Sequence, residues 1–465
     1  MKIVIAGAGA VGTHLATLLS KENQDIILVD EDSNKTETLS NSGDYDLLTL
    51  NVSPTSINGL KEAGVPGADL FIAVTPEETR NITCCMLAHA LGAKKTVARV
   101  DNSEYMTPEH LETFQKIGID SLIYPEMLAA EEIVDSFKYS WLRQYWEVHG
   151  GALLMLGAKM RETAKVLNIP LKDLCRPGAS PYHVVVIKRG ENTIIPGGND
   201  VLQLNDVAYF MTTKEHIETI RDLAGKEDYA DVHNVMIMGG SKTAYHVGRR
   251  KPSNVTLKII ETNDNTSRKL IELLDTDGIR IIRGDARDTR LLVDEGIRDT
   301  QAFAALTSDT EANILACMAA RRLGVHKTIA MVENMDYVSM AENLDIGTII
   351  NKKMIAASHI YKMMMRTDVA SLKCLTIANA DVSEFIVSEG SEVTKCAIRD
   401  LKLPQGVTLG GMVRDGVGAP IFGNTVLQPG DSVVVLCLSG KIKQMDRYFC
   451  KPTSLIKRAM SVLNS

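Results

Sequence analysis

The chain has 465 residues, of which 51 are basic and 58 acidic, giving a formal net charge of −7. This length exceeds what one hydrophobic core can organise and, at about 150 residues per domain, predicts three or four domains. A hydrophobic content of 45% and a charged content of 23% are ordinary for globular proteins and exclude a wholly disordered chain. The sequence has no basic block or aromatic-interleaved basic stripe, so nucleic acid is not an expected partner.

Apolar runs and cysteines predict the compartment. No apolar run approaches the ~20 residues of a membrane-spanning helix, and residues 1–7 lack the long apolar core of an export signal. The eight cysteines are scattered, without a C-x-x-C pair or a matching histidine spacing. We therefore expect reduced structural thiols, no metal site and a cytoplasmic location.

The first hundred residues predict a parallel sheet. Apolar segments at residues 2–6, 26–29, 47–50, 70–74 and 96–100 alternate with segments of helical pattern. This alternation is typical of βαβ units.

A glycine-rich turn directly follows the first of these strands and opens a helix. Its residues are Gly7, Ala8, Gly9, Ala10, Val11 and Gly12. In such a G-x-G-x-x-G turn the first glycine permits the tight bend, the second lets the main chain approach a pyrophosphate, and the third lets the helix pack closely on the strand. The helix N-terminus offers unpaired N–H groups to the phosphates. The turn predicts a dinucleotide or adenine-nucleotide site; the alternative is a degenerate domain that keeps its glycines for packing only.

Polar residues at the ends of later strands extend this site. Asp30 ends the second strand, where a carboxylate bonds the adenosine ribose hydroxyls and favours NAD(H) over NADP(H). Thr75 and Pro76 end the fourth strand and Arg99 ends the fifth, at the edge that presents ligand-contacting loops. Two alternatives stay open: Thr75 caps the next helix, and Arg99 forms a surface salt bridge instead of reaching phosphate oxygens.

The pattern changes after residue 125. Residues 126–137 have apolar side chains near helical spacing and predict a helix, which either crosses to the next domain or a neighbouring subunit or packs on its own sheet. From about Glu147 short apolar runs are broken by Gly, Pro and Asn, which predicts a small β-rich domain. His183 lies in one of these runs and is interpreted as a strand residue rather than a catalyst.

The whole pattern then repeats. Gly239 follows an apolar strand as Gly7 does, 232 residues later, and the same offset separates Asn81 from Asn313. The β-rich pattern also recurs, at residues 410–438. The predicted order is therefore sheet domain, β-rich domain, sheet domain, β-rich domain.

The second glycine turn is weaker than the first. It consists of Gly239, Gly240, Ser241, Lys242 and Thr243. Glu261 follows the strand at residues 256–260 and can take the ribose role, whereas Met331 stands where the first copy has Arg99. The turn is either a second ligand site or part of a structural copy that packs on the first.

Catalytic patterns are missing from the sequence. A dehydrogenase needs a substrate domain with an acid/base His or Lys, and the β-rich segments contain no obvious polar constellation of this kind. No G-x-S-x-G or H-E-x-x-H pattern occurs. We expect that the protein is not an enzyme; an NAD-dependent oxidoreductase is the alternative.

Further motifs accompany the two turns. They are Glu62-Ala63-Gly64, Ala68-Asp69, Ala73-Val74-Thr75, Asn81 and Ala98-Arg99-Val100 in the first copy, Arg283-Gly284-Asp285-Ala286, Glu295-Gly296, the run from Thr307 to Asn313 and Leu323-Gly324 in the second, and Arg189-Gly190 and Leu427-Gln428-Pro429-Gly430-Asp431 in the β-rich segments. With these motifs the chain resembles, over essentially its whole length, the Trk potassium-uptake regulatory subunits (TrkA-like), which have two RCK (KTN) domains.

The resemblance implies an α/β fold with two tandem Rossmann-type parallel-sheet domains, each followed by a small α+β RCK C-terminal subdomain. We place these four parts at residues 1–140, 141–228, 229–370 and 371–455, with a tail at 456–465. Residues 455–460 are either an amphipathic docking helix or a frayed end.

The resemblance also implies a function and partners. It implies a homo-oligomeric cytosolic ring, peripheral on the cytoplasmic face of the inner membrane and docked on a potassium-translocating membrane protein, with NAD(H) and ATP or ADP as competing ligands that change gating. The first site would use the glycine turn, Asp30, the backbone near Val52, Thr75-Pro76 and Arg99; the second would use Gly239 to Thr243 and Glu261. Asn51-Val52-Ser53 departs from the glycine-containing turn usual in the family. An RCK-type regulator of another cation transporter is a further alternative.

Overall fold

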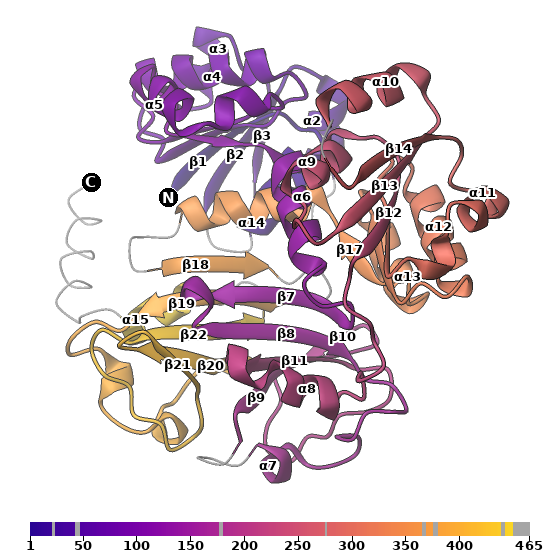
Figure 1. Cartoon of the computed structure of the whole chain (residues 1–465). Helices are drawn as coiled ribbons and strands as arrows, with labels where there is room; N and C mark the ends of the chain where they lie inside the picture. The colour runs from indigo at the N-terminus through magenta and orange to yellow at the C-terminus, as the bar shows by residue number, and fades with distance from the viewer. Residues whose placement is uncertain are drawn as a thin grey trace. The chain divides into compact units, whose positions relative to one another are not determined.

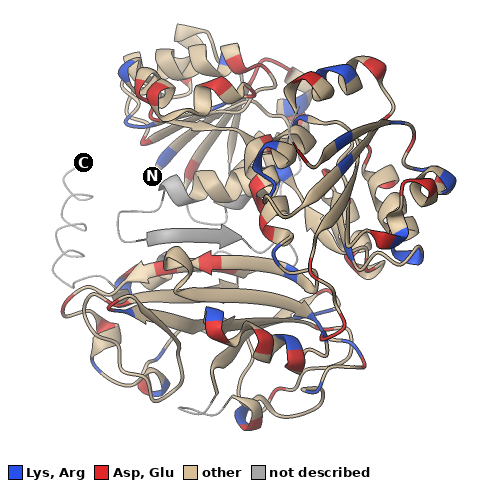
Figure 2. Ribbon diagram, viewed as in Figure 1, with Lys and Arg blue, Asp and Glu red and all other residues tan. Residues whose placement is uncertain are grey.

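The computed structural model describes residues 1–20, 24–41, 47–175, 180–274, 277–364, 369–374, 380–438 and 442–449. The chain divides into two compact units, Met1–Ala129 with Asn351–Arg366 and Ala130–Ile350 with Thr367–Ser465. The first unit holds one Rossmann-type domain, and the second holds another together with both β-rich subdomains (Figure 1). Lys and Arg are interspersed with Asp and Glu along the helices of each unit (Figure 2). The predicted tail helix lies outside the described residues.

The first Rossmann-type domain is a six-stranded parallel sheet in the order β3-β2-β1-β4-β5-β6. Its strands are β1 (Lys2–Ala6), β2 (Asp25–Asp30), β3 (Leu48–Asn51), β4 (Leu70–Ala73), β5 (Thr96–Arg99) and β6 (Ser121–Ile123). Its helices are α1 (Ala10–Ser20), α2 (Ser33–Asn41), α3 (Ile57–Glu62), α4 (Glu78–Ala90) and α5 (Pro108–Lys116). Sequence analysis predicted the first five strands and missed the three-residue β6.

The second Rossmann-type domain repeats this sheet as β14-β13-β12-β15-β16-β17. Its strands are β12 (Asn234–Met238), β13 (Thr256–Glu261), β14 (Ile279–Arg283), β15 (Ala302–Ala305), β16 (Lys327–Met331) and β17 (Thr348–Ile350). Its helices are α9 (Lys242–Arg250), α10 (Asp264–Leu273), α11 (Thr289–Asp294), α12 (Thr310–Arg322) and α13 (Asp336–Asn343). The repeat extends to side-chain detail, because the buried thiol of Cys85 donates to the Val97 carbonyl and that of Cys317 to the Ile329 carbonyl.

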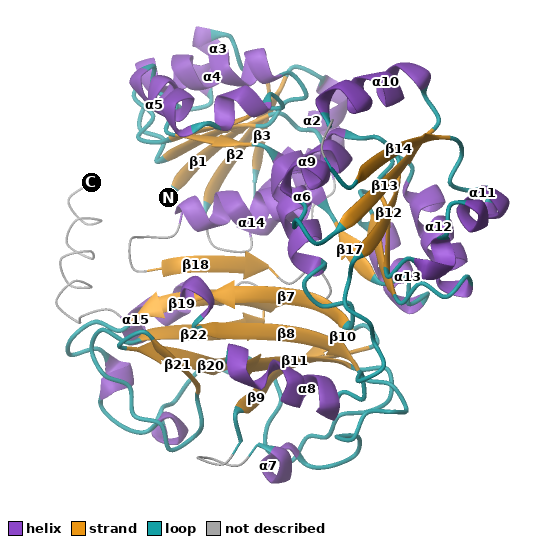
Figure 3. Cartoon of the chain, viewed as in Figure 1, coloured by secondary structure: helices purple, strands orange, loops and turns teal. Residues whose placement is uncertain are grey.

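Each β-rich subdomain is a five-stranded antiparallel sheet (Figure 3). The first has the order β10-β9-β11-β8-β7, with β7 (Leu142–Val148), β8 (Leu153–Lys159), β9 (Tyr182–Arg189), β10 (Asn192–Ile194), β11 (Val207–Thr212) and the short helices α7 (Leu171–Leu174) and α8 (Ile217–Leu223). The second has the order β18-β19-β22-β20-β21, with β18 (Val369–Cys374), β19 (Ala380–Ile386), β20 (Val407–Arg414), β21 (Val417–Pro420), β22 (Ser432–Leu438) and the short helix α15 (Asp446–Phe449). These sheets confirm the predicted fold class, although the exact domain boundaries stay a prediction.

The turn before the last long strand is tied in the same way in both subdomains. Arg189 forms a two-pronged ion pair with Asp206, at 3.0 and 2.8 Å, and Arg414 does so with Asp431, at 2.8 and 2.7 Å. Such planar pairs are the strongest form of charged hydrogen bond. The motif Arg189-Gly190 therefore supplies the arginine of the ion pair in the first subdomain, and the motif Leu427 to Asp431 supplies the carboxylate of the equivalent pair in the second.

The two β-rich subdomains share one apolar core. Val148, Met155 and Tyr209 of the first subdomain cluster with Val382 and Val434 of the second. Burying these side chains supplies the main favourable free energy of the contact, at about 25 cal/mol per Å² of apolar surface.

Two helices link the repeats. Helix α6 (Pro125–Ser136) begins in the first unit and ends in the second, where Glu131 pairs with Arg250 of α9 at 3.5 Å. Helix α14 (Lys352–Met364) follows the second Rossmann sheet but belongs to the first unit, where it packs on α1 and Lys352 lies 3.1 Å from Glu126. The helix predicted at residues 126–137 thus exists, and it crosses the boundary between the two compact units.

The close contact between the β-rich subdomains depends on a glycine. A Cβ added at Gly418 would lie 2.0 Å from the carbonyl oxygen of Ala152. We expect Gly418→Ala to lower the free energy of unfolding by about 1–3 kcal/mol, because the backbone must move to relieve the overlap. Gly197→Ala is the matched control, since its Cβ would meet only the Asp200 carboxylate at 3.8 Å. Equal melting temperatures for the two variants would contradict this packing.

Candidate functional site

In the first glycine turn the second glycine, Gly9, has free space beside its Cα. Gly7 has φ +110°, and a Cβ there would lie 3.0 Å from the amide nitrogen of Thr75. A Cβ at Gly12 would lie 1.9 Å from the carbonyl oxygen of Gly7. In contrast, a Cβ at Gly9 would meet no atom within 4 Å. The outer glycines are therefore required by backbone geometry and close packing, while the main chain at Gly9 is accessible to a ligand.

The carboxylate of Asp30 holds this turn against the end of β2. Its Oδ2 accepts a hydrogen bond from the Ala8 amide at 2.7 Å, and its Oδ1 accepts one from the Asp32 amide at 3.0 Å. Each carboxylate oxygen has a second lone pair. The half-buried Asp30 is thus positioned by the backbone and still has the capacity to accept a hydroxyl hydrogen bond.

A buried asparagine joins the ends of β4 and β5. The Oδ1 of Asn81 accepts from the Thr75 amide at 2.9 Å and from the Thr75 hydroxyl at 2.7 Å. Its Nδ2 donates to the Thr75 carbonyl at 3.0 Å and to the Arg99 carbonyl at 2.9 Å. The Thr75 hydroxyl is used in this network and not as the cap of α4, whose N-cap residue is Glu77. Sequence analysis aligned Asn81 with Asn313 but did not foresee this role.

The other predicted residues of the first site lie at the same edge of the sheet. Arg99 ends β5 half-buried, and within the described part of the chain its guanidinium has no carboxylate partner. The alternative of a surface salt bridge is therefore not realised among these residues. Pro76 is exposed, and Val52 packs on Gly59 of α3, since a Cβ at Gly59 would lie 3.0 Å from that of Val52.

A salt bridge that sequence analysis missed spans this edge. Arg80 of α4 forms a two-pronged ion pair with Glu31, and the Nη1–Oε1 distance is 2.8 Å. Hydrogen bonding to Arg80 lowers the pKa of Glu31. Since β2 and β4 flank β1 in the sheet, the pair joins the two sides of the crevice where ligands bind in such sheets. The acidic residue directly after Asp30 was the available signal.

In the second glycine turn a carboxylate again accepts from the main chain, but a side chain of the turn itself also accepts from a main-chain donor of the helix that follows. Glu261 accepts from the Gly240 amide at 2.6 Å and from the Asn263 amide at 2.6 Å, as Asp30 does from its two amides. Ser241, which stands where the first copy has Gly9, caps α9 by accepting from the Ala244 amide at 3.3 Å. The helix N-terminus therefore has one of its donors satisfied by its own chain.

Two further differences separate the second copy from the first. A Cβ at Gly240 would lie 2.6 Å from Leu270 and 3.0 Å from the Glu261 carboxylate. Met331, the counterpart of Arg99, is buried at 3% exposure, although Asn313 binds its carbonyl at 2.9 Å as Asn81 binds that of Arg99. Of the remaining predicted residues, Lys242 is exposed and Thr243 is buried. The second edge thus keeps the structural contacts and lacks the cation and the open glycine.

Other predicted features lie away from these edges. His183 lies within β9, where burial lowers its pKa to about 4. Among the described residues, no three His, Cys, Asp or Glu side chains gather as metal ligands. Nor does any helix in the described ranges have the length and apolar character to cross a membrane.

The groups at the first turn have the chemistry that a nucleotide needs: an open main chain at a helix N-terminus, a positioned carboxylate that accepts hydrogen bonds, and a cation at the end of β5. Comparison with known proteins identifies the family of these domains. The TrkA-N domain model matches residues 3–125 and 235–352, and the TrkA-C domain model matches residues 156–225 and 382–449. The chain belongs to the TrkA family of tandem TrkA-N and TrkA-C domains.

Similar proteins cover nearly the whole chain. The Trk system potassium uptake protein TrkA of Haemophilus influenzae is 29% identical over 97% of this chain and 98% of its own length. A TrkA homologue of Archaeoglobus fulgidus is 28% identical over 97% and 100%. These are named as potassium uptake proteins rather than enzymes, in agreement with the expectation that the chain is not an enzyme.

Solved structures share the fold. The GsuK RCK domain superposes with a TM-score of 0.59 at 15% identity, covering 96% of this chain and 94% of that one. The GsuK channel bound to NAD superposes with a TM-score of 0.58 at 15% identity, covering 96% and 78%.

The asparagine network is open to a direct test. We expect Asn81→Ala to lower the free energy of unfolding by at least about 2 kcal/mol, because it leaves buried main-chain groups of Thr75 and Arg99 unsatisfied. Asn313→Ala should cost a similar amount, and the exposed Asn34→Ala should have almost no effect. Thermal unfolding of the three variants checks this, and a neutral Asn81→Ala would show that the network contributes nothing.

Proposed function

We propose that this protein is a nucleotide-sensing regulatory subunit of a potassium uptake system, with NAD(H) and ATP or ADP as competing ligands of the first glycine turn. The observation that carries the proposal is the positioned carboxylate of Asp30 beside the open main chain at Gly9. The relatives named as potassium uptake proteins and the GsuK channel solved with NAD support it.

In this proposal the chain's own residues bind and orient the nucleotide. The amides that begin α1 receive the phosphates, because a helix N-terminus favours negative charge. Asp30 accepts from the ribose hydroxyls, and Arg99 reaches phosphate oxygens from the end of β5. Thr75, Pro76 and the backbone near Val52 line the rest of the ligand path.

Sensing requires that a ligand favour one conformation over another. A ligand shifts an equilibrium only by the difference in its affinity for the two states. NAD(H) and ATP differ in length and charge, so we propose that they favour different arrangements of neighbouring Rossmann-type domains in a homo-oligomeric ring. That ring would dock on a potassium-translocating membrane protein at the cytoplasmic face of the inner membrane. An RCK-type regulator of another cation transporter would use the same site with a different docking partner.

The Asp30 carboxylate gives the main test. We expect Asp30→Ala to weaken NADH and ATP binding about tenfold or more in calorimetry, since a hydrogen bond to a charged group contributes about 1.5–3 kcal/mol. The exposed Glu37→Gln on the neighbouring helix α2 is the control and should bind both nucleotides as the unaltered protein does. Unchanged affinity of Asp30→Ala for both nucleotides would contradict this placement of the ligand.

The second turn gives a complementary test. Because Ser241 caps α9 and Met331 replaces the cation, we expect Glu261→Ala to leave the tight nucleotide-binding isotherm unchanged at one nucleotide per chain. Two equal sites per chain, one of them lost in Glu261→Ala, would instead assign the second turn a ligand role.

The same preparation separates a sensor from an oxidoreductase. We expect NADH and ATP to compete without oxidation of NADH in the presence of a panel of carbonyl metabolites. Turnover at 340 nm with any member of the panel would favour the NAD-dependent oxidoreductase.

A further inference from the structure

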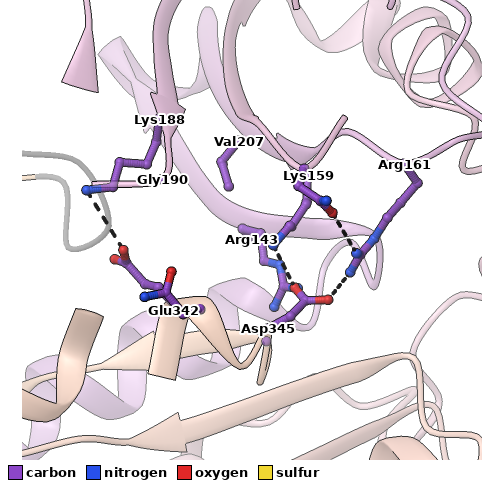
Figure 4. Close-up of a pocket in the computed structure, with 11 residues that line it drawn as sticks. Arg143, Lys159, Arg161, Lys188, Gly190, Val207, Glu342 and Asp345 are labelled. Carbon is purple, nitrogen blue, oxygen red and sulfur yellow. Dashed lines mark hydrogen bonds and ion pairs between the residues drawn. The ribbon is translucent and has the colours of Figure 1, made fainter. Parts of the chain in front are cut away.

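A cluster of cations surrounds one carboxylate where α13 meets the first β-rich subdomain. Asp345 Oδ2 lies 3.0 Å from Arg321 and also pairs with Arg161. Its Oδ1 lies 3.2 Å from Lys159 and also pairs with Arg143 (Figure 4). Four cationic side chains therefore share one carboxylate, whose single negative charge does not neutralise them.

Two more cations adjoin this cluster without a carboxylate partner in the described part of the chain. Lys327 is buried at 3% exposure and donates to the Leu142 carbonyl at 2.5 Å and the Thr348 hydroxyl at 3.0 Å. Lys226 is also buried at 3% exposure, and its ammonium lies 4.9 Å from the centre of the Tyr229 ring. The carbonyl, hydroxyl and ring that these two ammonium groups contact carry no negative charge and therefore do not compensate them.

One further ion pair borders the cluster. Lys188 of β9 lies 3.9 Å from Glu342 of α13 (Figure 4). Seven cationic side chains and two carboxylates thus meet at this contact. Burying an excess of like charge is costly unless a counter-charge is bound.

The electrostatic consequences appear at individual groups. Burial, with a smaller effect of Arg143, lowers the pKa of Lys327 to about 7, and burial together with nearby arginines lowers the pKa of Lys226 to about 8. Burial alone would raise the pKa of Asp345, but Arg143 and the other cations hold it well below its usual value. Burial raises the pKa of Glu342 to about 7, which weakens its ability to compensate the cations at neutral pH.

The cations line two cavities that share part of their wall. The larger has a volume of about 270 Å³ and includes Lys188 and Asn205 in its wall; the smaller, of about 30 Å³, includes Lys226 and Lys327. Both cavities are lined by Arg143, Lys159, Arg161 and Gly347. The larger volume lies just below the roughly 300–1,000 Å³ of pockets for drug-sized ligands. A small anion with several oxygens therefore matches it in size.

We propose that this larger basic cavity, between the second Rossmann-type domain and the first β-rich subdomain, binds a small polyvalent phosphate-bearing anion. Guanidinium groups are suited to phosphate because they present paired N–H donors in a planar fork, and ammonium groups supply point charges. The anion would join β7, β8 and β9 of one domain to α12 and α13 of the other. This site is separate from both glycine turns and does not depend on the proposed function.

Inorganic pyrophosphate is the probe for the experiment, with the full chain. We expect calorimetry to detect pyrophosphate binding, and Lys226→Gln to weaken it about tenfold or more, because one buried positive charge next to the larger cavity is removed. Lys226 has no carboxylate partner among the described residues, so its replacement breaks no ion pair in that part of the chain. Lys188→Gln, in the wall of the larger cavity, is the second variant should Lys226→Gln fail to fold.

Two controls identify the site. Lys214→Gln, an exposed lysine of the same subdomain, should bind pyrophosphate unchanged. Arg99→Gln, which removes the cation proposed to reach phosphate oxygens at the first glycine turn, should also bind it unchanged if the signal comes from the basic cavity. The proposal is overturned if no pyrophosphate binds, if Lys226→Gln and Lys188→Gln bind it as the unaltered protein does, or if citrate at equal ionic strength binds more tightly than pyrophosphate. Loss of NADH binding in any variant concerns the proposed function and leaves this result intact.

Discussion

The carboxyl edge of each Rossmann-type sheet depends on side chains that bond to the main chain. At this edge the strands end, and their amides and carbonyls lose their neighbours in the sheet, yet buried main-chain groups need partners. A carboxylate, Asp30 or Glu261, holds the glycine turn, and a buried asparagine, Asn81 or Asn313, joins the fourth and fifth strands. The loops that would contact a ligand are positioned by these bonds.

The two copies use this common frame differently. In the first, the space over Gly9 is open, and Arg99 ends β5 at the same edge of the sheet without a carboxylate partner in the described ranges. In the second, the Ser241 hydroxyl accepts a hydrogen bond from the Ala244 amide at the N-terminus of α9. Met331 stands at the position that corresponds to Arg99. Both copies thus keep the bonds that stabilise the edge, while the open second glycine and the arginine at the end of the fifth strand occur in the first copy and not in the second.

The β-rich subdomains combine two kinds of interaction. Their mutual contact is apolar and close, with Gly418 against the Ala152 carbonyl. The contact of the first subdomain with the second Rossmann-type domain is instead rich in cations around Asp345. An apolar contact is stable by itself, whereas an excess of buried positive charge is stabilised by a bound anion. The stability of the second contact should therefore depend on the anions in solution, whereas that of the apolar contact should not.

The sequence by itself determined the repeat, the alternation of strands and helices, the glycine turn and Asp30. These depend on local periodicity and on backbone geometry within a few residues, which a single sequence displays. Only the tertiary structure decided the pairing of Arg80 with Glu31, the capping of α9 by Ser241 and the cation cluster at Asp345. Arg143 and Asp345 are 202 residues apart, and no local pattern records which distant charges the fold brings together. Their meeting follows from how the domains pack, because apolar burial fixes the packing and the charges must then find partners within it.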